Sequence, residues 1–98
     1  MRAAVLIVAI FLASPAAAQD SQSGRNLAAG CAICHGTEGR PATKDLAPLA
    51  GMPREYIVRQ MSDFRDGKRS ATVMQQIAKG YTEPQIEAMA AWFASQKR

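Results

Sequence analysis

The residues of this chain that are best suited to covalent or metal chemistry are its only two cysteines and its only histidine. They lie in the run Cys31-Ala32-Ile33-Cys34-His35. A disulfide here would close a loop of only two intervening residues and would stabilise the chain very little, because the gain grows with loop length. Structural zinc needs four ligands, whereas this run supplies three and no second Cys/His cluster exists. These two readings are therefore disfavoured.

The same spacing is also found in redox-active cysteine pairs and in haem attachment motifs, and these two functions need different folds. A redox pair of the thioredoxin kind belongs to a βαβ unit, and this sequence shows no strand pattern. Cys-x-x-Cys-His, in contrast, is the attachment motif for c-type haem. We therefore predict one haem c, with Cys31 and Cys34 forming thioethers to its vinyl groups and His35 binding the iron.

Four helices and no strands are predicted to hold this motif. The first runs from residue 25 to residue 34, with Leu27 and Ala28 facing inward and the polar segment 19–23 frayed before it. Gly36 is expected to end this helix, because glycine adopts positive φ without strain. Residues 37–51 follow as a loop that is rich in glycine and proline.

The second helix is predicted to begin after Pro53 and to end before Gly67. One face of it is predicted to carry a stripe with i, i+4, i+7/8 spacing, which consists of Tyr56, Ile57, Gln60, Met61 and Phe64. A short third helix covers residues 72–79 and is stopped by Gly80.

The fourth helix starts at the capping box Thr82-Glu83-Pro84-Gln85. Its inward face is predicted to consist of Ile86, Met89, Ala90 and Phe93. The predicted fold class is all-α, with about four helices wrapped around one covalent haem.

Residues 1–18 have the layout of a cleaved secretory signal peptide. A short positive start, Met1-Arg2, precedes an uncharged run of 11 residues, Ala3–Ala13, and then Ser14-Pro15 and three alanines. The run is too short for a membrane-spanning helix, and the small residues at its end favour cleavage over an anchor or a buried helix. We predict cleavage between Ala18 and Gln19, which leaves a periplasmic cytochrome domain at 19–98 with no membrane span.

Composition explains why such a domain needs a haem. Residues 1–18 hold 15 of the 47 apolar residues, so the other 80 residues are only 40 % apolar. A core of that size is marginal, and a covalent haem adds a large apolar body to it. We therefore expect the haem-free protein to be largely unfolded.

The charges of the chain are dispersed. The formal net charge of +4 falls to +3 without Arg2, with no block of five like charges, so no nucleic-acid partner is expected. Lys68, Arg69 and Lys79 are most simply solvated surface, and docking of an acidic protein partner there is the alternative.

The sixth ligand of the iron must come from elsewhere in the chain. Met61 and Met89 fall in apolar stripes and are interpreted as core side chains. Met74 is favoured over Met52, because the chain must pass round the edge of the ring to reach its opposite face; an open sixth position is the third option.

The chain from about Gly24 onward resembles the small class I c-type cytochromes and, within them, the haem subunit of flavocytochrome c sulfide dehydrogenase. The resemblance is carried by the blocks Cys31–Gly39, Leu49-Ala50-Gly51, Pro53–Ile57, Phe64–Gly67, Ala71–Met74, Ile77–Tyr81 and Ile86–Ala94. It implies thioethers at Cys31 and Cys34 and iron ligands at His35 and Met74. It also implies an FAD-bearing partner subunit that oxidises sulfide, and a downstream cytochrome or oxidase.

One departure from the class concerns the group that orients the histidine ring. Class I cytochromes usually have Gly-Pro nine residues after the ligand, with the proline carbonyl accepting a hydrogen bond from the imidazole; this chain has Thr43-Lys44 there. We expect the carbonyl of Lys44 or of Pro48 to take that role.

A six-coordinate iron leaves no open site for substrate. We therefore expect the chain to transfer single electrons and not to catalyse bond chemistry by itself. The alternatives are a free-standing electron carrier to an oxidase or another cytochrome and, from a different class, a haem sensor or peroxidase with an open sixth position.

Overall fold

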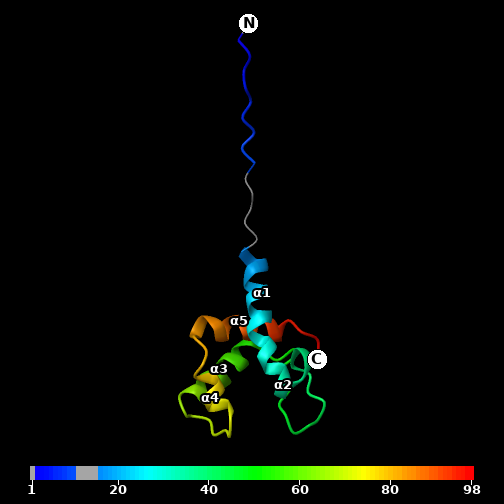
Figure 1. The fold of residues 1–98 in the computed structure, drawn as a ribbon, viewed down its shortest axis with the longest axis vertical. Coiled ribbons are helices and arrows are strands. Elements are labelled where there is room, and N and C mark those ends of the chain that lie inside the picture. The colour runs from blue at the N-terminus through cyan, green and yellow to red at the C-terminus, as the bar shows by residue number, and fades with distance from the viewer. Residues whose placement is uncertain (1, 11–15) are drawn as a thin grey trace.

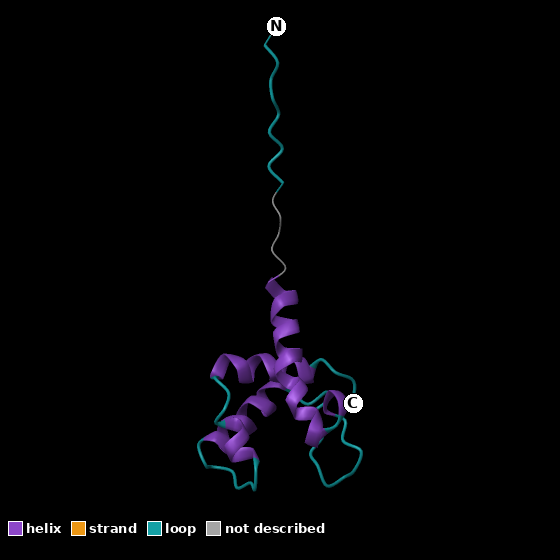
Figure 2. Ribbon diagram, in the orientation of Figure 1, coloured by secondary structure: helices purple, strands orange, loops and turns teal. Residues whose placement is uncertain are grey.

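The computed structural model describes residues 2–10 and 16–98, and within them the regular structure is entirely helical (Figure 2). The elements are α1 (Ala16–Ala28), the 3-10 turn η1 (Ala29–Cys31), α2 (Ala32–His35), the 3-10 turn η2 (Thr37–Gly39), α3 (Arg54–Arg65), α4 (Met74–Ala78) and α5 (Glu83–Ala94). The predicted all-α fold class is confirmed.

The segment predicted as a signal peptide is described only in part. Residues 2–10 form neither helix nor strand and expose their apolar side chains, whereas Ser14-Pro15 and the end of the apolar run lie outside the described residues. Helix α1 begins at Ala16 and so passes through the predicted cleavage point. Among the described helices, none has both the length and the apolar content to cross a bilayer.

The N-terminal helix differs from its prediction at both ends. Segment 19–23, expected to be frayed, is helical, because α1 packs closely on α5 and buries Gly24 at the contact. Gln22 also donates a hydrogen bond to Asn26 at 3.2 Å. Tertiary packing of this kind stabilises helices that their own sequence would leave marginal. Towards the haem motif, η1 interrupts the predicted continuous helix, so the two cysteines lie on different elements.

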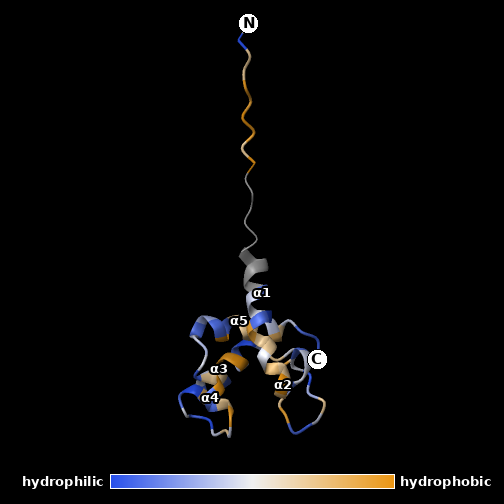
Figure 3. Cartoon of the chain, viewed as in Figure 1, coloured by the Kyte–Doolittle hydropathy of each residue, from blue (hydrophilic) through white to orange (hydrophobic). Residues whose placement is uncertain are grey.

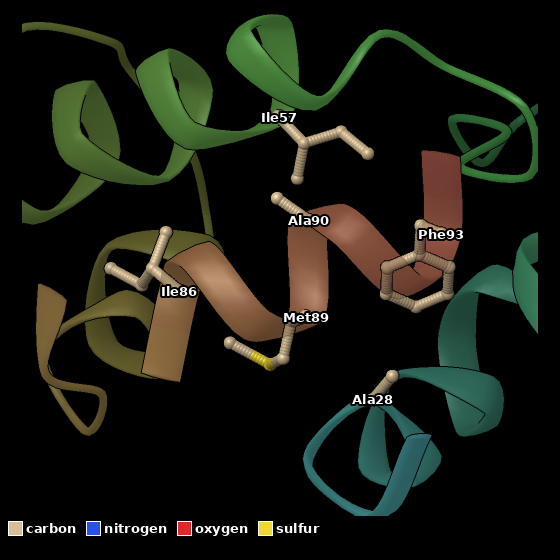
Figure 4. Packing of buried hydrophobic residues seen from close by; sticks show 6 residues of the cluster. All are labelled: Ala28, Ile57, Ile86, Met89, Ala90 and Phe93. Carbon is tan, nitrogen blue, oxygen red and sulfur yellow. The ribbon is translucent and has the colours of Figure 1, made fainter. Parts of the chain in front are cut away.

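The core is centred on α5, which packs against α1 on one side and α3 on the other (Figure 1). All four residues predicted for its inward face are buried, and Figure 4 shows them meeting Ile57 of α3 and Ala28 of α1. Leu27 is half-buried against this cluster, as predicted. Tyr56, which belongs to the predicted stripe of α3, does not pack in this cluster and is 46 % exposed. The residues of α3 that pack toward the core are Ile57, Val58 and Met61, so Val58, which the predicted stripe did not include, also faces the core.

The helix boundaries in the second half of the chain follow the predicted start and stop residues. Helix α3 begins directly after Pro53 and ends before Gly67, which has φ of +74°. Helix α4 has five residues and is shorter than the predicted 72–79. The predicted capping box is present: Thr82 Oγ1 accepts a hydrogen bond from Gln85 N at 3.3 Å, and Thr82 N donates to Gln85 Oε1 at 2.9 Å.

Substituting Thr82 with alanine is expected to lower the free energy of unfolding by about 1 kcal/mol, because the amide of Gln85 loses its capping partner. Urea unfolding of the haem-loaded protein, followed by helical circular dichroism, measures the change. Thr43→Ala is the control: Thr43 is exposed in a loop, and its loss should change stability by less than about 0.5 kcal/mol. Equal stability of the two variants would contradict a stabilising role for the cap.

Candidate functional site

The haem motif lies where the chain turns back after α1. Cys31 ends η1, whereas Cys34 and His35 lie on α2, which stops at Gly36. Gly36 has φ of +81°, and a Cβ atom there would come within 2.0 Å of the Arg40 carbonyl oxygen. The predicted role of Gly36 is confirmed: only glycine permits this turn without strain. The turn directs residues 37–50 back past the histidine.

The ring of His35 is oriented by a backbone carbonyl. Its Nδ1 lies 2.7 Å from the carbonyl oxygen of Ala47. Because a carbonyl can only accept a hydrogen bond, Nδ1 must carry the proton and donate it. The neutral ring then keeps its lone pair on Nε2, the nitrogen that remains free to bind a metal. The geometry thus engages Nδ1 in a hydrogen bond and leaves Nε2 as the nitrogen that can bind a metal.

The orienting carbonyl is not one of the two predicted. We expected Lys44 or Pro48, and the acceptor is Ala47, twelve residues after His35. A residue that precedes proline is restricted to extended conformations, so Pro48 limits the conformations open to Ala47. The loop is closed by Leu49 N and Ala50 N, which donate to the Gly39 carbonyl at 2.9 and 3.1 Å. The sequence indication that could have identified Ala47 is its place directly before Pro48.

The two cysteines have different surroundings, and neither forms a disulfide. Cys31 is half-buried and packs against the core, whereas Cys34 is exposed. Burial raises the pKa of the Cys31 thiol, and the nearby Cys34 raises it further. Redox-active cysteine pairs instead depend on a thiol with a lowered pKa. The environment of Cys31 is therefore not that of a thioredoxin-like nucleophile.

The four methionines after residue 18 occupy two kinds of environment. Met89 is buried in the core, as predicted, and Met61 packs against it. Met52 also packs against the core and lines a cavity of about 640 Å³ beside the loop 39–52. Met74 begins α4, is half-buried, and is not among the residues that pack on the core cluster. In Figure 1 α4 lies across the view from α2, which carries His35.

The described part of the chain leaves much apolar surface around the predicted ligands. Of its eight buried apolar residues, four are alanines, so few large side chains form the core. Several large apolar side chains are instead exposed by 37 to 90 %: Ile33, Leu46, Tyr56, Val73 and Ile77. They lie on α2, on α3 and α4, and in the loops beside these helices, where Figure 3 shows hydrophobic segments. A large apolar group such as haem fits residues of this character, because burying their exposed surface is favourable.

Comparison with known proteins agrees with these features. The model of the family "Cytochrome c" matches residues 21–97. The chain is 38 % identical over 84 residues to the cytochrome subunit of sulfide dehydrogenase from Chlorobaculum tepidum, covering 85 % of this chain and 76 % of that protein. It is 37 % identical over 81 residues to cytochrome c4 of Pseudomonas aeruginosa, covering 83 % of this chain but only 40 % of the relative.

A solved structure shows the same fold. The thiosulfate dehydrogenase of Marichromatium purpuratum superposes with a TM-score of 0.74 and 29 % identity, over 79 % of this chain and 19 % of that one. The match to the family model spans most of the sequence and includes the Cys-x-x-Cys-His motif. The chain therefore belongs to the cytochrome c family, as a class I c-type cytochrome that carries a c-type haem.

Proposed function

We propose that this electron carrier is the haem subunit of a periplasmic flavocytochrome c sulfide dehydrogenase. It would accept single electrons from an FAD-bearing subunit and pass them to a downstream cytochrome or oxidase. The observation that carries electron transfer is the His35 ring, held by Ala47 with Nε2 free, directly after the two cysteines. The partner is supported by the Chlorobaculum tepidum relative, a sulfide dehydrogenase subunit of which this chain covers 76 %.

We assign the haem to four residues. Cys31 and Cys34 would hold it through thioethers, and His35 and Met74 would bind its iron. The choice of Met74 is supported by its position outside the core against which Met52, Met61 and Met89 pack. When bound, the haem supplies a one-electron iron couple, and methionine–histidine ligation raises its potential. The chain orients the imidazole through Ala47, and its exposed apolar side chains would supply apolar surroundings for a haem.

The thioether assignment predicts how many covalent bonds to haem each cysteine variant keeps. Cys31→Ser and Cys34→Ser should each retain one covalent bond, and the double variant should release all of its haem into acidified organic solvent. In alkaline pyridine, each single variant should absorb further to the red than the parent protein, because one vinyl group stays conjugated with the ring. Ile33→Ala, between the two cysteines, is the matched control and should keep both bonds. A single variant with the parent spectrum would remove that cysteine from the assignment.

A free-standing carrier is the second candidate, favoured by the nearly equal identity to cytochrome c4 of Pseudomonas aeruginosa, 37 % against 38 %. Purification of the tagged protein from its native host distinguishes the two candidate functions. A sulfide dehydrogenase subunit should bring down a flavin-bearing chain in a fixed ratio, and sulfide should reduce the haem of that complex. Purification of the haem protein alone, with no reduction by sulfide, would favour the free carrier. The mass of the purified chain also tests cleavage between Ala18 and Gln19.

A further inference from the structure

Arg69 folds back onto α3 from the loop that leads to Met74. Its guanidinium lies 4.7 Å from the centroid of the Phe64 ring, and its Nη1 donates a hydrogen bond to Gln60 Oε1. Gln60 and Phe64 are four residues apart and so share one face of the helix. A cation over an aromatic ring is attracted by the electron-rich face of that ring. The side chain therefore fastens the middle of the loop to the last two turns of α3.

The backbone of Arg69 connects the same two helices. Its amide and that of Lys68 both donate to the Asp63 carbonyl, at 3.2 and 2.9 Å. On the other side, the Arg69 carbonyl accepts a weak hydrogen bond from Gln75 Nε2 at 3.5 Å. Gln75 directly follows Met74 in the first turn of α4. Arg69 thus joins the end of α3 to the turn that carries the proposed ligand.

Apart from backbone hydrogen bonds at its two ends, the loop segment 67–73 has one side-chain attachment. Within the described residues, Arg69 is the only member of segment 67–73 whose side chain forms a polar bond or a cation–π contact. Val73, next to Met74, is 55 % exposed. A loop attached at few points samples more conformations, and ordering it for a bond costs entropy. Helix α4 itself packs on α3, so Arg69 adds to this packing the side-chain attachment of the loop that leads to Met74.

We infer that Arg69 is a positioning residue for the sixth iron ligand: its contacts with Gln60 and Phe64 hold the loop so that Met74 stays on the iron. This inference rests on the proposed function, because it takes Met74 as the ligand. Arg69 itself does not touch the metal. Its loss should make Met74 easier to displace, with little change in the stability of the helices.

Imidazole displacement in the ferric, haem-loaded protein measures this directly. Imidazole competes with the methionine sulfur, and its binding removes the weak red charge-transfer band that depends on that sulfur. Arg69→Ala should bind imidazole roughly two- to fivefold more tightly, the factor that corresponds to one cation–π contact at an exposed site. Arg69→Lys keeps a cation near Phe64 and should recover part of the difference.

Lys68→Ala is the matched control, because it removes one positive charge from the neighbouring position of the same loop. It should bind imidazole as the parent protein does, with the same urea unfolding midpoint as Arg69→Ala. In the background of Phe64→Leu, which removes the aromatic ring, Arg69→Ala should have a smaller effect than in the parent.

Two results would overturn the inference, and they are distinguishable. If Arg69→Ala and Lys68→Ala bind imidazole equally while Met74→Ala loses the charge-transfer band, Met74 is the ligand and Arg69 does not position it. If Met74→Ala keeps the band, the ligand assignment in the proposed function fails and the role of Arg69 fails with it.

Discussion

Replacing Met74 with alanine is expected to lower the reduction potential by on the order of 0.2 V, a quarter of the range of about 0.8 V that axial ligands span in haem proteins. A methionine sulfur raises the potential of a histidine-ligated haem, and alanine leaves water or nothing in its place. Redox titration of the purified haem protein measures the change. The ferric variant should also lose its six-coordinate low-spin spectrum or bind imidazole without competition.

Met52→Leu and Met61→Leu are the matched controls for this result. Both methionines pack against the core, and a leucine of similar volume should preserve that packing. Their potentials should stay near that of the parent protein. A large fall in Met52→Leu, with none in Met74→Ala, would move the sixth ligand to Met52. An unchanged low-spin spectrum and potential in all three variants would exclude Met52, Met61 and Met74 as the sixth ligand. A parent protein with an open sixth position would favour a sensor or peroxidase.

The second large effect is expected at the contact between α1 and α5. A Cβ atom at Gly24 would lie 2.4 Å from the Ala88 carbonyl oxygen and 3.2 Å from Trp92 Cβ. Gly24→Ala must therefore push the two helices apart, at a cost of about 3 kcal/mol. The better helix propensity of alanine returns about 1 kcal/mol of this. The net loss of about 2 kcal/mol is large for a domain of this size, whose total stability is about 4–12 kcal/mol.

Gly30→Ala provides the control for this prediction. The nearest atom to a Cβ at Gly30, Tyr81 Oη, is 4.0 Å away, so alanine fits there. This variant should be unchanged or up to about 1 kcal/mol more stable. Urea unfolding of the two haem-loaded variants, followed by circular dichroism, tests the difference. If Gly24→Ala is as stable as Gly30→Ala, the close approach of α1 to α5 is not what stabilises the fold.

Local sequence patterns correctly predicted helix starts and turns wherever one residue type determines the backbone conformation. Pro53 and the Thr82–Gln85 box mark helix starts, because each meets a local requirement of a helix N-terminus. Gly36 marks a turn that other residues cannot adopt without strain. The inward face of α5 follows from its 3.6-residue period, which depends on no other segment.

The predictions were wrong where the conformation or the contacts of a residue depend on a segment outside its own local sequence. Segment 19–23 is polar, and it is helical because the helix to which it belongs, α1, packs against α5 near the other end of the chain. Tyr56 belongs to the predicted stripe of α3, but its neighbour Ile57 is the residue that packs in the cluster with α5, and Tyr56 is 46 % exposed. The carbonyl that accepts the hydrogen bond from His35 was predicted to be that of Lys44 or Pro48, and it is that of Ala47. The path of this loop has no periodic pattern and depends on the hydrogen bonds that close it onto Gly39.

The sequence by itself determined the cofactor, because the run from Cys31 to His35 matches the Cys-x-x-Cys-His attachment motif of c-type haem. It also determined the helical class, because its hydrophobic period is local. Only the tertiary structure decided that Ala47 orients the imidazole and that Arg69 ties the Met74 loop to α3. Both contacts are made where a loop folds back onto a helix, and the path of such a loop is not recorded by any periodic pattern in the sequence.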